Sequence, residues 1–326
     1  MAEPRQVLVT GGAGFIGSHL VPVLIGRGDH VVVIDDLSTG RLSNLDGIPD
    51  EQLQFIEATV HDQVGGGSLP VFDEIYHLAA AVGVKLIVES PVQCIENNVH
   101  ETSLLLRAAV EWACPILIAS TSEVYGKSER LPFCEDDDVT YGPTTESRWS
   151  YACSKAIDEH LALGWYASSG LPVVIARFFN TVGPQQRGRW GMVLPRFVAA
   201  ALRGEPLHVH GDGTQERCFV DVRDVAPVLP RLLGNTSAHG RVVNVGHDES
   251  VSISDLATRV IEVLNSSSDI KLVTMADDYG RDIEDLQARV PDLRRLRSLC
   301  EFHATFDLDQ TILDTAAAMR ADKSGP

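Results

Sequence analysis

The sequence lacks the features that would place the protein in a membrane or in an oxidising compartment. No apolar run reaches the roughly 20 residues that a bilayer-spanning helix needs, and the N-terminus leads straight into a strand pattern without a signal peptide. The six cysteines are scattered, with no C-x-x-C pair and no grouping with histidine. We therefore expect a cytoplasmic protein that has reduced thiols and no metal site.

Positive charge is also scarce. The 326 residues include 27 Lys and Arg against 45 Asp and Glu, which gives a formal net charge of −18. That charge opposes binding to nucleic acid and to anionic membranes, and an anionic small ligand would need a local group of arginines. Arginines of this kind occur in the second half of the chain, at Arg187, Arg189, Arg196, Arg217, Arg281 and Arg289. Of these we expect Arg196, like Arg203, to be only a surface charge.

Short runs of aliphatic residues alternate with helical patterns through the first 180 residues. Because these runs are continuously apolar, they fit parallel strands that are covered on both faces. We predict strands at 6–10, 30–35, 53–60, 74–80, 115–121 and 172–180, and helices near 15–27, 92–112 and 150–169. This order predicts an α/β fold with a doubly wound parallel sheet of the Rossmann type.

The character of the sequence changes after residue 180, where Pro, Gly and Arg become frequent and helical patterns become shorter. We expect a Rossmann domain at 1–180 and a smaller α/β substrate-binding lobe at 181–326. Segments near 218–246, which contain "FVDVRDV" and "RVVNVGHD", have the apolar texture of a core and are expected to return to the main sheet.

A glycine-rich stretch, "VLVTGGAGFIGSHL", follows the first strand and opens the first helix. Gly12, Gly14 and Gly17 fit the pattern G-x-G-x-x-G, and Gly11 precedes them. Glycines here permit a tight turn and let backbone N–H groups approach a pyrophosphate, which the helix N-terminus also favours. In this context of strand, loop and helix, the pattern predicts a dinucleotide site.

Acidic residues at the ends of the next two strands indicate which dinucleotide is bound. Asp35 ends the second strand, within the expected distance of roughly 20 residues from the loop, where a carboxylate accepts from a ribose hydroxyl and repels a 2′-phosphate. Asp36 adds to that repulsion, so NAD is favoured over NADP. Asp62 follows the third strand and is either an acceptor for adenine or a solvated turn residue.

Tyr151 and Lys155 lie four residues apart on a predicted helix, so their side chains leave the same face. A tyrosine has a pKa near 10, and lowering it to about 7 takes roughly 4 kcal/mol of preferential stabilisation of the phenolate. A nearby ammonium and a nicotinamide cation can provide it. The fifth strand ends in Ser120, Thr121 and Ser122, which places hydroxyls at the edge of the sheet where such folds bind ligands.

The chain resembles the extended short-chain dehydrogenases/reductases, a superfamily of NAD-dependent nucleotide-sugar epimerases, dehydratases and decarboxylases. The resemblance covers about residues 7–315 and rests on "TGGAGFIGSHL", "YHLAA", "STSEVYG", "YACSK", "RFFNTVGP" and "FVDVRDV". It implies that Tyr151 is the catalytic base and acid, that Lys155 activates it, and that Thr121 relays a proton through its hydroxyl.

The resemblance also implies two sets of binding residues. The cofactor set comprises Gly11, Gly14, Phe15, Ile16, Gly17, Asp35, Asp36, Asp62, Leu78, Ala79, Ala80, Asn98 and Lys155. The set for a UDP-sugar substrate comprises Lys85, Ser122, Arg148, Asn180, Val193, Arg217 and Arg289. A homodimer joined through the helices near 95–112 and 150–169 is expected on the same ground.

The possible reactions all begin with oxidation of a sugar hydroxyl, usually at C4. Family 4,6-dehydratases carry Thr-Asp-Glu where this chain has Thr121-Ser122-Glu123, so dehydration is disfavoured. The chain looks most like the UDP-glucuronate decarboxylases, in which Glu123 matches a catalytic carboxylate and Arg289 a catalytic arginine. It also resembles UDP-glucose 4-epimerases, which use the same tyrosine chemistry, and this alternative stays open. A non-catalytic dinucleotide sensor would typically lack the Tyr/Lys pair and is disfavoured.

Overall fold

The structure is a computed structural model and describes residues 4–66, 69–80, 90–188, 192–274, 276–277 and 286–322. Its centre is a seven-stranded sheet with the order β11-β6-β5-β4-β1-β2-β3, in which every neighbouring pair is parallel. The strands are β1 (Gln6–Thr10), β2 (His30–Asp35), β3 (Leu53–Glu57), β4 (Glu74–His77), β5 (Ile116–Thr121), β6 (Val173–Phe178) and β11 (Arg241–Val245). The sheet confirms the predicted doubly wound α/β fold.

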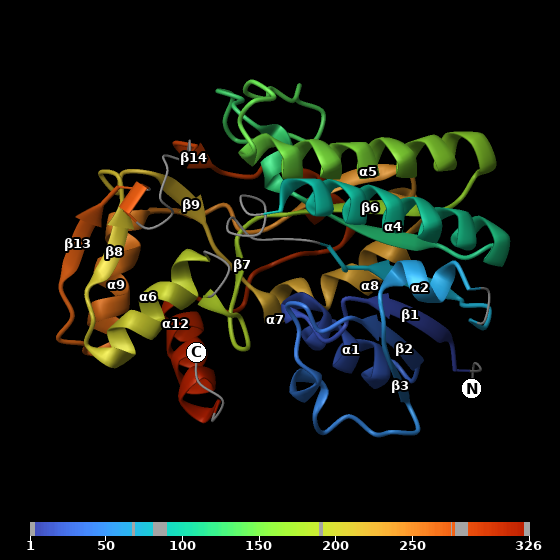
Figure 1. The fold of residues 1–326 in the computed structure, drawn as a ribbon, viewed down its shortest axis with the longest axis horizontal. Coiled ribbons are helices and arrows are strands. Elements are labelled where there is room, and N and C mark those ends of the chain that lie inside the picture. Colours follow the sequence, from blue (N-terminus) through green and yellow to red (C-terminus); the bar gives the residue numbers. More distant parts are fainter. Residues whose placement is uncertain are drawn as a thin grey trace.

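Helices cover both faces of this sheet because its strands are apolar on both sides (Figure 1). One face is covered by α1 (Phe15–Gly26), α7 (Val222–Val225), α8 (Val228–Leu233) and α11 (Arg294–Leu299). The other is covered by α2 (Val60–Val64), α4 (Pro91–Trp112) and α5 (Arg148–Ser169). Along β1, Val7 and Val9 pack into the first layer and Leu8 into the second, as the alternation of strand side chains requires.

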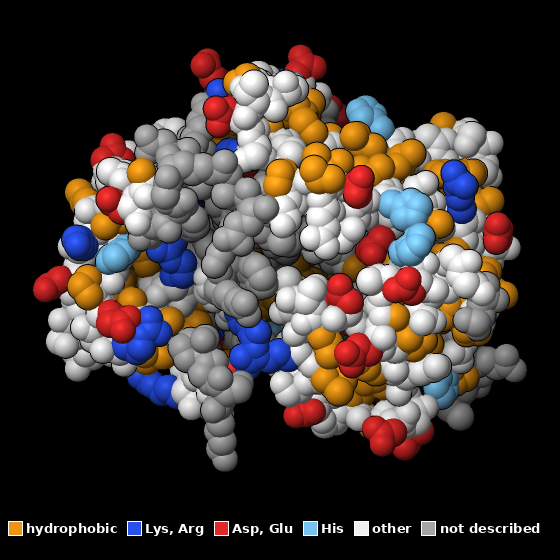
Figure 2. Space-filling model, viewed as in Figure 1, with side chains coloured by type: hydrophobic (Ala, Val, Ile, Leu, Met, Phe, Trp, Pro, Cys, Tyr) orange, Lys and Arg blue, Asp and Glu red, His pale blue; other side chains and the backbone are white. Residues whose placement is uncertain are grey.

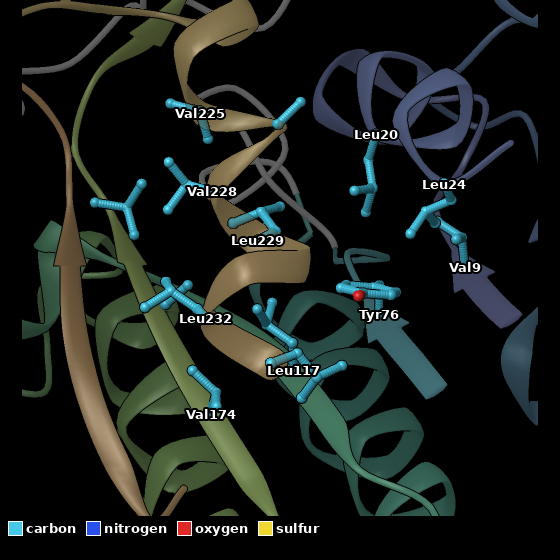
Figure 3. Close-up of a cluster of buried hydrophobic side chains, with 14 of the residues drawn as sticks. Val9, Leu20, Leu24, Tyr76, Leu117, Val174, Val225, Val228, Leu229 and Leu232 are labelled. Atoms are coloured by element: carbon cyan, nitrogen blue, oxygen red, sulfur yellow. The ribbon is translucent and has the colours of Figure 1, made fainter. Parts of the chain in front are cut away.

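The first of these layers is drawn in Figure 3. Leu20 and Leu24, one helical turn apart on α1, point toward Val9 and Tyr76 of the sheet, while Leu229 of α8 lies on the same layer. Burying a leucine side chain of this kind contributes about 1.5–3 kcal/mol, so the layer fixes the position of α1 relative to β1. The glycine-rich loop that joins these two elements is thereby held at the carboxyl edge of the sheet.

The second lobe has its own core, made by three helices and the short strands of three small sheets. The helices are α6 (Val193–Arg203), α9 (Ile253–Leu264) and α12 (Leu308–Ala321), and their apolar faces meet around Phe197, Leu256 and Ile312. The strands are β7 (Thr181–Val182), β8 (Leu207–His210), β9 (Glu216–Cys218), β10 (Val220–Asp221), β12 (Ser250–Ser252), β13 (Ile270–Val273) and β14 (Ala288–Arg289). They form the small sheets β10-β7, β12-β9-β14 and β13-β8. Short 3-10 helices complete the structure at Leu42–Leu45, Ser122–Tyr125 and Thr236–Ala238.

The segments near 218–246 are divided between the main sheet and the small sheets of the second lobe. Residues 241–245 form β11, the edge strand of the seven-stranded sheet, and α7 and α8 pack on that sheet. By contrast, β9 pairs with β12 and β14, and β10 pairs with β7, so the expectation that this part also returns to the main sheet is corrected. The chain therefore crosses between the two lobes more than once. Within the described residues, no helix has both the length and the apolarity needed to cross a bilayer.

Candidate active site

A cavity of about 640 Å³ lies between the carboxyl edge of the main sheet and the second lobe. Its volume is in the range of sites for small molecules and cofactors, and its position is the one where doubly wound sheets bind ligands. Of the predicted site residues that the structure describes, all line it except Asp62 and Asn98. Figure 2 shows basic side chains gathered over the second lobe and the middle of the molecule, while acidic side chains dominate the half that carries β2 and β3.

The glycine-rich loop is shaped to admit a dinucleotide. Gly11 has a φ of +69°, and a Cβ there would lie 2.7 Å from the backbone nitrogen of Ala79; a Cβ on Gly17 would lie 2.3 Å from the carbonyl oxygen of Gly11. Gly14 is the N-cap of α1 and offers no side-chain acceptor, so no side chain caps the first N–H groups of this 12-residue helix. A pyrophosphate fits this cradle, because it needs close backbone approach and N–H donors.

Asp35 has two roles at the end of β2. Its carboxylate accepts hydrogen bonds from the backbone N–H groups of Ala13, at 2.9 Å, and Leu37, at 2.8 Å, and so fixes the loop to the strand. Burial raises the pKa of Asp35, while these N–H groups oppose the rise and Asp36 adds to it. The carboxylate also lines the cavity, where it can accept from a ribose hydroxyl.

Two predicted residues, Asp62 and Asn98, lie outside the cavity lining. Asp62 is exposed, and its carboxylate accepts from the hydroxyl of Thr59 at 2.7 Å in a cap of α2. Asn98 is buried behind the cavity, where its amide donates to the hydroxyl of Ser154 at 3.2 Å and so joins α4 to α5. Lys85 lies outside the described residues, as do Arg189 and Arg281.

Tyr151 and Thr121 meet where α5 passes the end of β5. The Thr121 hydroxyl accepts from the backbone N–H of Glu123 at 3.2 Å, which leaves its own proton to donate to the phenol oxygen of Tyr151. Burial raises the pKa of Tyr151 above its usual value, Glu123 raises it further, and the bond from Thr121 opposes the rise. The protein without a ligand therefore keeps the phenol protonated, and ionising it would take additional positive charge in the site.

Lys155 has a buried partner that the sequence analysis did not identify. Its ammonium donates to the carboxylate of Asp158 at 2.7 Å, and the two side chains are only 2% and 0% exposed. Burial raises the pKa of Asp158, and Lys155 and the Thr102 hydroxyl oppose that rise. The ammonium is therefore held in one place on α5, at the wall of the cavity.

Glu123 lies between two arginines. Its carboxylate pairs with Arg289 of β14 at 2.5 Å and with Arg148, the first residue of α5, at 3.3 Å. These ion pairs join the end of β5 to the second lobe, because β14 belongs to the three-stranded sheet β12-β9-β14 of that lobe. In the parallel register of β14 and β9, Arg289 lies opposite Arg217, so both guanidinium groups enter the cavity from the same side.

The far end of the cavity contains residues that the sequence analysis missed. His208 and His210 of β8, Gln215 and Phe197 line it near the predicted Val193. Arg196 also lines the cavity, so the expectation of a plain surface charge is corrected; Arg203 does pair with Glu205 at the surface. The alternation of "LHVHG" was a usable signal, because it places both histidines on one face of a strand.

The end of the cavity near β2 and β3 contains Thr59, Val60 and Glu101, which no motif indicated. Glu101 lies inside α4, where the surrounding sequence shows only a helical pattern. No group of three or more His, Cys, Asp or Glu side chains suited to a metal ion occurs in the part of the chain that the structure describes.

Comparison with known proteins agrees with this geometry. Residues 7–246 match the family model of the NAD dependent epimerase/dehydratase family. The UDP-N-acetyl-alpha-D-glucosaminuronate decarboxylase of Bacillus cytotoxicus is 38% identical over 319 residues, which cover 95% of this chain and 96% of that protein. UDP-glucuronic acid decarboxylase 1 of Arabidopsis thaliana is 37% identical over 90% of this chain, and the match spans 64% of that protein.

A solved structure extends the comparison to the bound state. The UDP-glucuronic acid 4-epimerase from Bacillus cereus, in complex with UDP-glucuronic acid and NAD, is similar with a TM-score of 0.86 and 26% identity. The match covers 97% of this chain and 99% of that one. A related fold thus holds a dinucleotide and a nucleotide-sugar together.

Proposed function

The chain belongs to the NAD-dependent epimerase/dehydratase family, and on that premise we propose that it is a decarboxylase of UDP-linked hexuronic acids. The observation that carries the proposal is the position of Glu123 between Arg148 and Arg289, beside Tyr151. Guanidinium groups bind carboxylates in charge-assisted and often bidentate contacts. A site that already holds one carboxylate between arginines suits a substrate that brings another.

The chemistry follows from the order of these residues along the cavity. Tyr151, as the phenolate, takes the proton of the sugar C4 hydroxyl, with Thr121 in position to relay it. NAD, held by the glycine-rich loop, accepts the hydride from C4 and can return it at the end. The 4-keto sugar is then a β-keto acid, so the bond between C5 and the carboxyl carbon breaks with the ketone as electron sink and CO2 leaves.

The second half of the reaction needs a proton at C5. The electrons of the broken bond reside in an enolate over C4 and C5, and protonation at C5 gives the UDP-4-keto-pentose, or the UDP-pentose once hydride returns. Arg289 binds the substrate carboxylate before cleavage, and Glu123, its ion-pair partner, is placed to hold the water molecule that gives its proton to C5. Arg217 serves the diphosphate from the neighbouring strand, because arginine matches phosphate oxygens geometrically.

A 4-epimerase is the second candidate. Its support is the likeness to the UDP-glucuronic acid 4-epimerase of Bacillus cereus, together with Tyr151 chemistry that both reactions share. In that case the 4-keto sugar keeps its carboxylate, rotates within the cavity and receives hydride on the opposite face of its C4 carbonyl.

One experiment separates the two candidates. The purified protein is incubated in turn with UDP-glucuronate, UDP-N-acetylglucosaminuronate and UDP-glucose, and products are followed by NMR and CO2 release. We expect CO2 and a pentose or 4-keto-pentose from a uronate and no turnover of UDP-glucose. Formation of the C4 epimer without CO2 would reject the decarboxylase in favour of the epimerase.

We also propose that the protein is a cytoplasmic homodimer joined through α4 and α5. These two helices pack against each other and expose apolar side chains, including Val92, Ile95, Ile157 and Tyr166. Figure 2 shows hydrophobic side chains across the part of the surface formed by α5. Light scattering coupled to size-exclusion chromatography should give twice the mass of one chain, and a single-chain mass at micromolar concentration would contradict the dimer.

A further inference from the structure

The geometry of the cavity locates the adenosine end of the cofactor. Tyr151 and Thr121 mark the reacting end past β5, and Asp35 marks the ribose position past β2, with the glycine-rich loop after β1 between them. Since β2 and β3 lie on the opposite side of β1 from β5, the base of the dinucleotide extends over the end of β3. That part of the cavity is lined by Thr59 and Val60.

Glu101 enters the same end of the cavity from α4. It is half-buried, and its carboxylate accepts a hydrogen bond from the backbone N–H of Val60, which orients it across the gap between α4 and α2. This bond uses one of about four lone-pair positions, so the carboxylate can accept from a ligand as well. Adenine presents an exocyclic amine with two donors, and hypoxanthine presents a carbonyl oxygen at the same position.

We propose that Glu101 is a specificity-determining residue for the cofactor base, and that its carboxylate accepts a hydrogen bond from the exocyclic amine of adenine. The inference rests on the NAD site of the proposed enzyme and extends it to the choice between purine bases. A carbonyl oxygen in place of the amine would face the carboxylate with no hydrogen to share, which leaves a partly buried acceptor unpaired and costs affinity.

The surroundings of Glu101 make this recognition depend on pH. Burial raises the pKa of Glu101 to about 7, and the carboxylates of Asp36 and Asp62 add to the rise while the Val60 N–H opposes it. His61 of α2 and His100 of α4 also face this gap, with their ring nitrogens 2.9 Å apart. The adenine amine binds the ionised form, so NAD affinity should fall as the pH drops below about 7.

The test measures binding, independently of turnover. NAD and nicotinamide hypoxanthine dinucleotide are titrated calorimetrically into the full-length chain freed of cofactor, at pH about 8 and about 6. We expect the wild type to prefer NAD by at least tenfold at the higher pH, and to lose several-fold in NAD affinity at the lower pH. In Glu101→Gln, the new amide can donate or accept, so the preference for NAD should fall to about threefold or less. The part of the pH dependence that the Glu101 carboxylate causes should also disappear.

Glu96→Gln is the matched control, because Glu96 is an exposed residue of the same helix that does not line the cavity. It makes the same change in charge and leaves both histidines in place, so it should behave as the wild type. A Glu101→Gln variant that keeps the full preference for NAD overturns the inference, and so does a wild type that binds the two dinucleotides equally. A chain that binds neither dinucleotide would instead overturn the NAD site itself.

Discussion

Tyr151 is held in surroundings that oppose its ionisation. The proposed reaction transfers a proton to its oxygen, so this oxygen should be essential for turnover. Tyr151→Phe keeps the ring and its packing and removes the titratable group. We expect turnover of the UDP-uronate to fall by at least about 100-fold while NAD stays bound, measured by NMR and by cofactor absorbance. Tyr166→Phe, on the exposed side of the same helix α5, is the control. Turnover near that of the wild type in Tyr151→Phe would reject the assignment.

A substitution of Arg289 should affect CO2 release and C4 oxidation to different extents. Arg289→Lys keeps the charge but loses the planar pair of donors that a carboxylate binds bidentately. We expect CO2 release from the UDP-uronate to be impaired more than the initial C4 oxidation, seen as NADH absorbance, because Tyr151, Thr121 and Lys155 are unchanged. Arg203→Lys, at an exposed ion pair outside the cavity, should leave both steps intact. Equal loss of both steps in Arg289→Lys would assign the arginine to substrate binding in general.

Among individual residues, the sequence indicated those that belong to a local motif and missed those that reach the cavity from elsewhere in the chain. Tyr151 and Lys155 share one helical face, and the glycine-rich loop has a fixed spacing, so both could be read locally. Asp158 could not, because a carboxylate near a helical lysine is usually a surface pair. Glu101 reaches the site only because α4 lies beside α2, and that contact joins parts of the chain that no local pattern connects.

The attachment of α5 to the sheet depends on a buried ion pair between elements. Arg177 of β6 makes two hydrogen bonds to Glu159 of α5, at 2.9 and 2.7 Å, and the guanidinium lies 4.6 Å from the centre of the Tyr125 ring. Glu159→Gln would leave the buried guanidinium uncompensated, and we expect a loss of about 3–5 kcal/mol in the free energy of unfolding, measured with urea. Arg203→Ala, at an exposed pair, should change it by less than about 1 kcal/mol. A small effect of Glu159→Gln would show that water reaches Arg177.

Helices and strands could be predicted from the sequence where they are long enough for the periodicity of their apolar residues to be recognised. The strands of the main sheet and the helices α1, α4 and α5 appeared near their observed positions. Three predicted strands extended too far, since β3, β4 and β6 end at Glu57, His77 and Phe178. Each continues into residues that turn toward the cavity, as Thr59 does when it caps α2. The strands of the second lobe have two to four residues, too few for alternation to be recognised.

The whole molecule should lose stability in mild acid through one buried histidine. His77 bonds Thr10 of β1 at 2.8 Å and Thr102 of α4 at 3.1 Å, and burial, assisted by the charge of Lys155, lowers its pKa to about 3. The unfolded chain binds this proton near pH 6.5, so stability is lost as the pH falls from about 6.5 toward 3, by up to about 1.4 kcal/mol per pH unit.

His77→Gln tests this prediction, because glutamine keeps polar atoms in the core and does not titrate. Urea unfolding of the variant and the wild type is compared at several pH values between about 7 and 5. The variant should be less stable at pH about 7, where the imidazole bonds are lost, but its stability should decline less steeply with acid. Parallel declines in the two proteins would mean that other groups cause the acid sensitivity.

Glu123, between Arg148 and Arg289, imitates the group that the proposed substrate brings. A uronate that takes Arg289 exchanges one carboxylate for another, so the number of ion pairs in the site stays the same. A neutral hexose offers only hydroxyls in that exchange and would leave a guanidinium without an anion if it displaced Glu123. If the proposed function is correct, the protein's own side chain would compete with the substrate for Arg289, and discrimination between acidic and neutral sugars would arise from what each ligand must displace as well as from what it contacts.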